Sequence, residues 1–210
     1  MLHYAFLLAF FLTSTGLMAQ DERYYRKMLS GDLGKKEEIE DGLKKFFVSG
    51  DAYLIDLNGD GIDERIVPQK RDGVDWIEIQ DSSQRAIFSG KLFTTGANGH
   101  IFRIKIVNLN PKVKTLIVFL DEGTTQGRKL ESQGIIYLLS FENNDLSTLK
   151  LTRGSRFFHE MKGQRDQYFR RAYKVNVYDI DEDGEREIVV EYRHIQRIFK
   201  YAGLGDWKIY

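Results

Sequence analysis

The chain has 210 residues, with 31 basic and 31 acidic side chains, 14 Phe, 11 Tyr and no Cys. This balanced charge gives no overall field that would attract nucleic acid or an anionic membrane. The absence of Cys excludes a disulfide framework and a lipid-modified N-terminal cysteine. The length is sufficient for one full hydrophobic core, or for one domain with a small appendage.

The first 19 residues contain no acidic side chain, Lys or Arg. An apolar run over residues 1–12 is followed by a looser polar stretch and then by Ala19, which predicts a secretory signal peptide cleaved after Ala19. An uncleaved anchor is the alternative, but the run is short for a span of about 20 residues. We therefore expect a periplasmic or secreted protein with no membrane span after cleavage.

Helical patterns are predicted over residues 21–30 and 35–48. In the second segment Ile39, Leu43, Phe46 and Phe47 fall on one face, and Lys and Glu residues lie on the other. The expected organisation is a signal peptide over residues 1–19, a short helical N-terminal appendage over 20–48 and a β-repeat domain over 49–210.

From residue 51 onward the pattern becomes β, with apolar and polar residues alternating between Gly- and Asn-rich turns. The fold class is therefore mainly β. Strands are predicted over residues 52–57, 64–68, 75–80, 86–88, 101–107, 115–120, 135–141, 146–150, 169–177, 187–192 and 197–201.

Two nine-residue stretches in this region repeat each other. Residues 56–64 (DLNGDGIDE, the first loop) and 179–187 (DIDEDGERE, the second loop) both carry oxygen-bearing side chains at positions one, three, five and nine, and Gly at position six. Each stretch follows one predicted strand and precedes another. Ca²⁺ prefers six to eight oxygen ligands, and Gly allows the sharp bend that directs them to one centre.

These loops differ from the EF-hand loop, which requires a bidentate Glu at position twelve. The twelfth residues are Val67 and Val190, and the flanks are strand-like. The loops instead resemble the calcium loop of FG-GAP or VCBS-type repeats, which form the blades of integrin α-subunit propellers. Carried over residue by residue, the resemblance implies the following ligands: Asp56, Asn58, Asp60, Glu64 and the Ile62 carbonyl, and Asp179, Asp181, Asp183, Glu187 and the Glu185 carbonyl.

The alternative interpretation is a pair of acidic surface turns, since Asp, Asn and Gly are common turn residues. If both loops bind Ca²⁺, we expect the second site to be the tighter one. It offers four carboxylates, whereas the first offers three and an amide.

A degenerate third copy is suggested by Asn108, Asn110 and Lys112, which occupy positions one, three and five of a shorter turn. In this interpretation the Lys112 ammonium replaces a cation; an ordinary hairpin is the alternative. Three repeats are too few for a closed propeller, which usually has four to eight blades. A partial β-propeller-like array, or stacked antiparallel sheets with strand–calcium loop–strand hairpins, is therefore expected.

Residues 150–174 contain eight basic and two acidic side chains, a net charge of +6, with aromatic residues between them. One hypothesis is a docking surface for an anionic envelope component or a protein partner, with Arg165, Arg170, Arg171 and Lys174 as contacts. The alternative is a solvated loop whose aromatic residues pack inward.

No HExxH motif, Cys/His cluster, GxSxG motif or P-loop occurs in the sequence. We therefore predict no catalytic residues and an exported calcium-binding β-repeat protein that acts as a binding or scaffolding module. An exported hydrolase of envelope polymers with structural calcium is the alternative, and a subunit of a larger surface complex is a further one.

Overall fold

A computed structural model of the chain describes residues 44–47, 51–93, 99–126, 129–163 and 167–210. The predicted signal peptide, the predicted helices up to residue 43 and Arg165 lie outside these ranges. Within them, no helix combines the length and the apolar character that crossing a bilayer would require.

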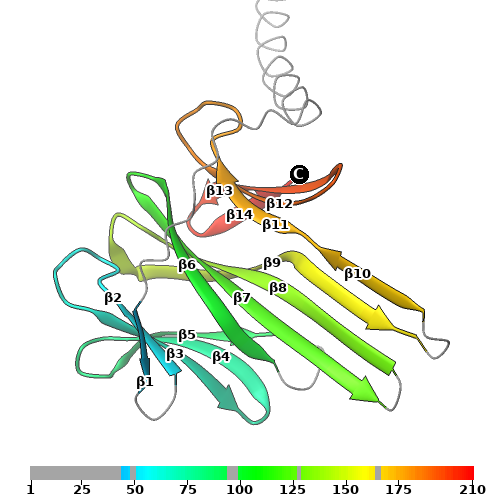
Figure 1. Ribbon diagram of the computed structural model, residues 1–210. Helices are drawn as coiled ribbons and strands as arrows, with labels where there is room; N and C mark the ends of the chain where they lie inside the picture. The colour runs from blue at the N-terminus through cyan, green and yellow to red at the C-terminus, as the bar shows by residue number, and fades with distance from the viewer. Residues whose placement is uncertain (1–43, 48–50, 94–98, 127–128, 164–166) are drawn as a thin grey trace, which may run out of the picture.

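The described chain is all-β and forms three antiparallel sheets (Figure 1). The N-terminal sheet contains β1 (Lys44–Phe47), β2 (Asp51–Ile55), β3 (Glu64–Arg71), β4 (Val74–Gln80) and β5 (Ala86–Leu92). The middle sheet contains β6 (His100–Asn110), β7 (Val113–Gln126), β8 (Lys129–Glu142), β9 (Asp145–Lys162) and β10 (Tyr168–Ala172). The C-terminal sheet contains β11 (Lys174–Tyr178), β12 (Glu187–Tyr192), β13 (Ile195–Gly203) and β14 (Asp206–Ile209).

The predicted mainly-β class is confirmed, and each predicted strand overlaps an observed one. The predicted helix over residues 35–48 is wrong at its end, because Lys44–Phe47 form β1 and pair antiparallel with β2. Phe46 and Phe47 also have high β propensity, and the edge of β2 supplies the backbone partners that decide between the two structures.

In every sheet, strands that are adjacent in sequence are neighbours in space. The strands β2–β5, β6–β9 and β11–β14 each make a four-stranded antiparallel unit, and β1 and β10 are added at edges. The first connection of each unit is, in turn, the first loop, the β6–β7 turn and the second loop.

The middle sheet is packed on both faces (Figure 1). Leu116, Val118 and Leu120 belong to a core shared with the N-terminal sheet. Ile117 and Phe119, which point the other way along β7, belong to a core shared with the C-terminal sheet. This double burial explains why residues 115–120 and 135–141 are nearly continuous apolar runs rather than alternating ones.

Candidate metal centre

The two predicted loops adopt the same backbone conformation. Position six has a positive φ in both, +84° at Gly61 and +86° at Gly184. Position four is also left-handed, with φ +82° at Gly59 and +59° at Glu182. Glycine tolerates this region without a steric penalty, so the sharp bend predicted at position six is confirmed.

The glutamate at position nine is tied to position two in each loop. The Leu57 N–H donates to Glu64 Oε2 at 2.7 Å, and the Ile180 N–H donates to Glu187 Oε2 at 2.9 Å. The side chains of Leu57 and Ile180 are fully buried, and both glutamates are buried as well. This bond fixes Oε2 of each glutamate, and the other oxygen of Glu187 lies 3.5 Å from the Lys200 ammonium.

The aspartate at position one organises the turn. The Gly61 N–H donates to Asp56 Oδ2 at 2.9 Å, and the Gly184 N–H donates to Asp179 Oδ2 at 3.1 Å. Asx bonds of this kind occur in ordinary acidic turns as well as in metal loops, so the loop backbone alone does not distinguish the two interpretations.

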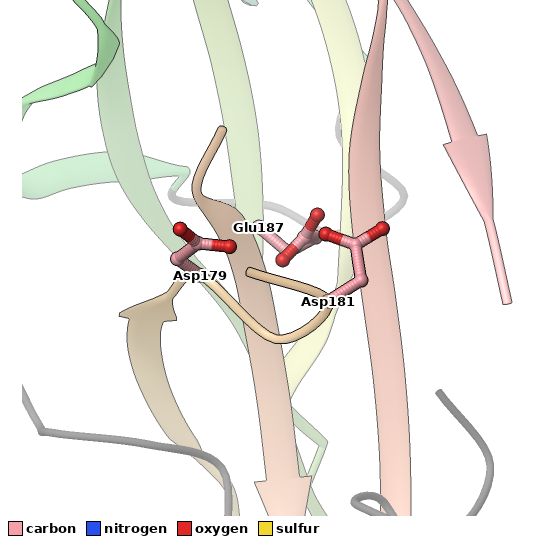
Figure 2. Close-up of side chains that lie close together, drawn as sticks. All are labelled: Asp179, Asp181 and Glu187. Carbon is pink, nitrogen blue, oxygen red and sulfur yellow. The ribbon is translucent and has the colours of Figure 1, made fainter. Parts of the chain in front are cut away.

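The second loop shows an additional feature. Oxygens of Asp179, Asp181 and Glu187 all lie within 4.8 Å of one another, and within the described ranges this is the one group of three such side chains that converges. Two oxygens on opposite sides of a calcium ion, each roughly 2.4 Å from it, are about 4.8 Å apart. Figure 2 shows the carboxylates of Asp181 and Glu187 close together and that of Asp179 directed toward them.

Each of these side chains also carries an unsatisfied oxygen. Asp179 Oδ1, Asp181 Oδ1 and Glu187 Oε1 are buried and accept no hydrogen bond from the described chain. A buried carboxylate oxygen without a partner is costly, because it has lost water and gained nothing in return. Asp179, Asp181 and Glu187 thus combine convergent carboxylates with buried oxygens that accept no hydrogen bond from the described chain, and carboxylate oxygens are the ligands that a hard cation prefers.

Lys200, on β13, reaches this site from outside the loop. Its Nζ donates to Asp181 Oδ2 at 2.5 Å and to Asp183 Oδ2 at 2.6 Å, and it lies 3.5 Å from Glu187 Oε1. The ammonium group therefore neutralises part of the acidic cluster, in the region where a bound cation would lie.

The electrostatics of the second loop follow from this burial. Burial raises the pKa of Glu187 to about 7, against the lowering effect of the Ile180 N–H. Burial alone would raise the pKa of Asp183, but hydrogen bonds from Lys200 and the Glu185 N–H leave that pKa lowered. Burial would lower the pKa of Lys200, but its bonds to Asp181 and Asp183 leave it raised.

The first loop is less convergent. Asn58 stands at position three, and its amide donates to Asp60 Oδ2 at 2.9 Å. Both oxygens of Asp56 accept backbone N–H groups, from Gly59 and Gly61. Burial raises the pKa of Glu64. The structure thus brings together Asp179, Asp181 and Glu187 of the predicted ligands, and it does not gather the first-loop set around a common centre.

The proposed third copy is an ordinary tight turn. Asn110 Oδ1 accepts the N–H groups of Lys112 and Val113, and the Lys112 side chain is exposed. Pro111 stands at position four, and proline cannot adopt the positive φ found there in both loops. The ammonium predicted for Lys112 is instead found at the second loop, from Lys200.

The turn nevertheless contacts the second loop. The Arg186 N–H donates to the Leu109 carbonyl at 2.9 Å, and Asn110 Nδ2 donates to Glu185 Oε1 at 3.0 Å. The Glu185 side chain therefore links the C-terminal sheet to the middle sheet through a hydrogen bond. Sequence reasoning missed both this contact and Lys200: the contact joins the second loop to a turn far away in the sequence, and Lys200 lies outside the repeated motif.

The basic segment over residues 150–174 is largely strand, in β9 and β10, and the solvated-loop interpretation is wrong for that part. Arg170 lies over the Phe158 ring and Arg171 over the Phe169 ring, with 5.6 Å and 5.2 Å from guanidinium carbon to ring centroid. Lys174 is exposed at the start of β11.

Comparison of the chain with protein-family models, with curated proteins and with solved structures finds no match.

Proposed function

We propose that the chain is an exported, calcium-stabilised β-repeat protein that acts as a binding or scaffolding module at the cell envelope or outside the cell. The observation that carries the proposal is the convergence of the Asp179, Asp181 and Glu187 carboxylates, each of which has a buried oxygen that accepts no hydrogen bond from the described chain. Weak calcium sites suit a location outside the cytoplasm, where calcium is abundant.

The role of calcium in this proposal is structural. The second loop joins β11 to β12 and contacts the β6–β7 turn through Arg186 and Glu185. A cation that held the loop closed would therefore stabilise the C-terminal sheet and its junction with the middle sheet. At about 1 mM calcium and a Kd near 0.1 mM, occupancy of one site adds about 1.4 kcal/mol to the free energy of unfolding.

The architecture proposed for the repeats is a partial propeller with three blades. Three four-stranded units, each with its loop or turn at the first connection, support this arrangement. The middle unit is longer than the first because β7, β8 and β9 are each longer than their counterparts β3, β4 and β5, and because β10 is added beside β9. These additions account for the wider spacing between Asn108 and Asp179 than between Asp56 and Asn108.

The hydrolase alternative needs a cleft with a carboxylate pair apart from both loops. The pocket described on the middle sheet is lined by arginine, histidine and aromatic residues, with no Asp or Glu among its described lining residues. That pocket gives the hydrolase alternative no support.

The proposal is tested by titrating the protein with calcium in a calorimeter and by measuring its thermal unfolding with and without calcium. We expect saturable binding and a melting temperature about 3–6 °C higher in 1 mM calcium than in chelator, at roughly 2–4 °C per kcal/mol for a chain of this size. Asp181→Asn should abolish the shift. Asp206→Asn, which removes an exposed carboxylate paired with Lys150, is the matched control and should retain it. Identical melting in chelator and calcium would refute the proposal.

A further inference from the structure

A pocket of about 440 Å³ lies on the part of the middle sheet formed by β8, β9 and β10. The C-terminal sheet contributes Arg197 from β13, and Tyr173, at the junction of β10 and β11, also lines the pocket. No residue of either acidic loop lines it. Its volume is within the range of small-molecule sites, about 300–1,000 Å³.

The pocket is strongly basic. Arg153, Arg156, Arg171, Arg197 and His159 line it, and no described lining residue is Asp or Glu. None of the four guanidinium groups lies within salt-bridge distance of a carboxylate of the described chain; the one acidic contact is Glu131 Oε1, 3.8 Å from His159 Nε2. Arginine stays protonated at all physiological pH values, so four positive charges share this pocket without compensation by a lining acid.

The strand register explains how the basic residues come together. His159 pairs across the sheet with Gln133 on one side and with Arg171 on the other. Arg156 then pairs with Ile135 and Arg153 with Tyr137, because the β8–β9 register shifts twice in this stretch. In a regular strand His159 and Arg156 would point to opposite faces. The irregularities in β9 therefore place Arg153 and Arg156 beside the same β8 face as His159.

Aromatic rings hold two of the arginines in position. The guanidinium carbon of Arg171 lies 5.2 Å from the Phe169 centroid and 5.6 Å from that of Tyr192. The corresponding distance from Arg197 to Tyr173 is 5.9 Å. Arg171 Nη1 also donates to the Tyr173 hydroxyl at 3.4 Å. The other N–H donors of the two guanidinium groups match the paired oxygens of phosphate and carboxylate.

We propose that this pocket binds a soluble anion carrying at least two phosphate or carboxylate groups. One singly charged group would compensate only a quarter of the guanidinium charge, whereas a multivalent anion can engage arginines from both sheets at once. This site would supply the binding activity of the proposed module. It does not depend on calcium, so it can be tested separately.

Binding is measured by calorimetry on the full chain after calcium has been removed with chelating resin, since the probes themselves bind calcium. Inorganic pyrophosphate and citrate are the test ligands, and inorganic phosphate is the weaker reference. We expect saturable binding of one pyrophosphate or citrate per chain, tighter than that of phosphate and weaker at higher salt.

Arg156→Gln and Arg197→Gln remove exposed side chains from two different sheets and should each weaken binding about ten- to a hundredfold. Arg156→Lys keeps the charge but loses the paired donors, so its affinity should lie between those of the unsubstituted protein and Arg156→Gln. Arg85→Gln removes an equal charge from an exposed turn outside the pocket and should change affinity less than about twofold. Circular dichroism and melting curves verify that each variant is folded.

Three results would overturn the proposal: no saturable binding of either probe, an equal loss in Arg85→Gln, or a loss in only one of the two pocket variants. Vesicles of phosphatidylcholine, with and without phosphatidylglycerol, form a further arm. Binding to the anionic vesicles alone, without competition from pyrophosphate, would indicate a membrane-docking surface and would also overturn it. None of these results depends on whether calcium raises the melting temperature.

Discussion

Replacing Lys200 with methionine should lower stability in chelator and tighten calcium binding. A unit charge about 4 Å from a divalent cation is repelled by roughly 8 kcal/mol at an effective dielectric constant of 20. A site with a Kd near 0.1 mM has about 5.5 kcal/mol of binding free energy. The Lys200 ammonium, which bridges Asp181 and Asp183, must therefore leave before calcium can bind.

When the Lys200 ammonium leaves the loop it loses two charge-assisted hydrogen bonds, and its solvation by water partly offsets this cost. We estimate a net cost of about 1–2 kcal/mol, so Lys200→Met should bind calcium roughly tenfold more tightly. In chelator the same substitution leaves the carboxylates of Asp181, Asp183 and Glu187 uncompensated. The expected loss is about 1–3 kcal/mol, or roughly 3–10 °C in melting temperature.

Thermal unfolding in chelator and in 10 mM calcium, with calorimetric titration, measures both effects. Lys150→Met is the matched control, because Lys150 makes one short ion pair with Asp206 in an exposed position. It should cost less than about 1 kcal/mol and leave calcium affinity unchanged. If Lys200→Met melts like the unsubstituted protein in chelator, or binds calcium no more tightly, then Lys200 does not compete with a cation at this loop.

Three further predictions concern the pH dependence of stability, the relative calcium affinity of the two loops, and the packing at Gly154. Burial raises the pKa of Glu187 from 4.5 to about 7, so the protonated carboxyl favours the folded state. Without calcium, the free energy of unfolding should therefore fall by roughly 2 kcal/mol, with solvent screening included, as the pH rises from 4.5 to above 7. Glu187→Gln should remove this pH dependence from the melting curves. Asp183→Ala should reduce calcium affinity in calorimetry by a larger factor than Asp60→Ala, and equal losses would contradict a tighter second site. Gly154→Ala should cost about 1–3 kcal/mol in denaturant unfolding, because its Cβ would lie 2.7 Å from Ile136 Cγ1 and 2.9 Å from the Ile136 carbonyl oxygen; an unchanged midpoint would mean that the strand yields there.

The loops were predictable from sequence because their geometry is local. Asp179, Asp181 and Glu187 occupy fixed places in a nine-residue pattern, and Gly184 marks the left-handed bend. Lys200 was not predictable, because it reaches the loop through the pairing of β12 with β13. No short-range pattern specifies which residue that pairing brings opposite Glu187.

The fold was predictable in class and less so in extent. Alternation and turn residues indicated most strands, but the ends of β7 and β8 and the short β14 gave weaker signals. The helical periodicity before residue 48 competed with an equally acceptable strand over Lys44–Phe47, and pairing with β2 decided the outcome. The pocket depends on register shifts in β9, which leave no sequence signal of their own.

The shared packing of the middle sheet has a consequence for synthesis. Ile66, Ile77 and Ile79 of the N-terminal sheet form a core with residues of the middle sheet, which follow later in the chain. A nascent chain that ended before β6 would present one bare apolar face, the kind of surface that aggregates or recruits chaperones. The N-terminal sheet should therefore become stable only once the middle sheet has been synthesised and packed against it. A product truncated before β6 would be insoluble rather than a smaller functional domain.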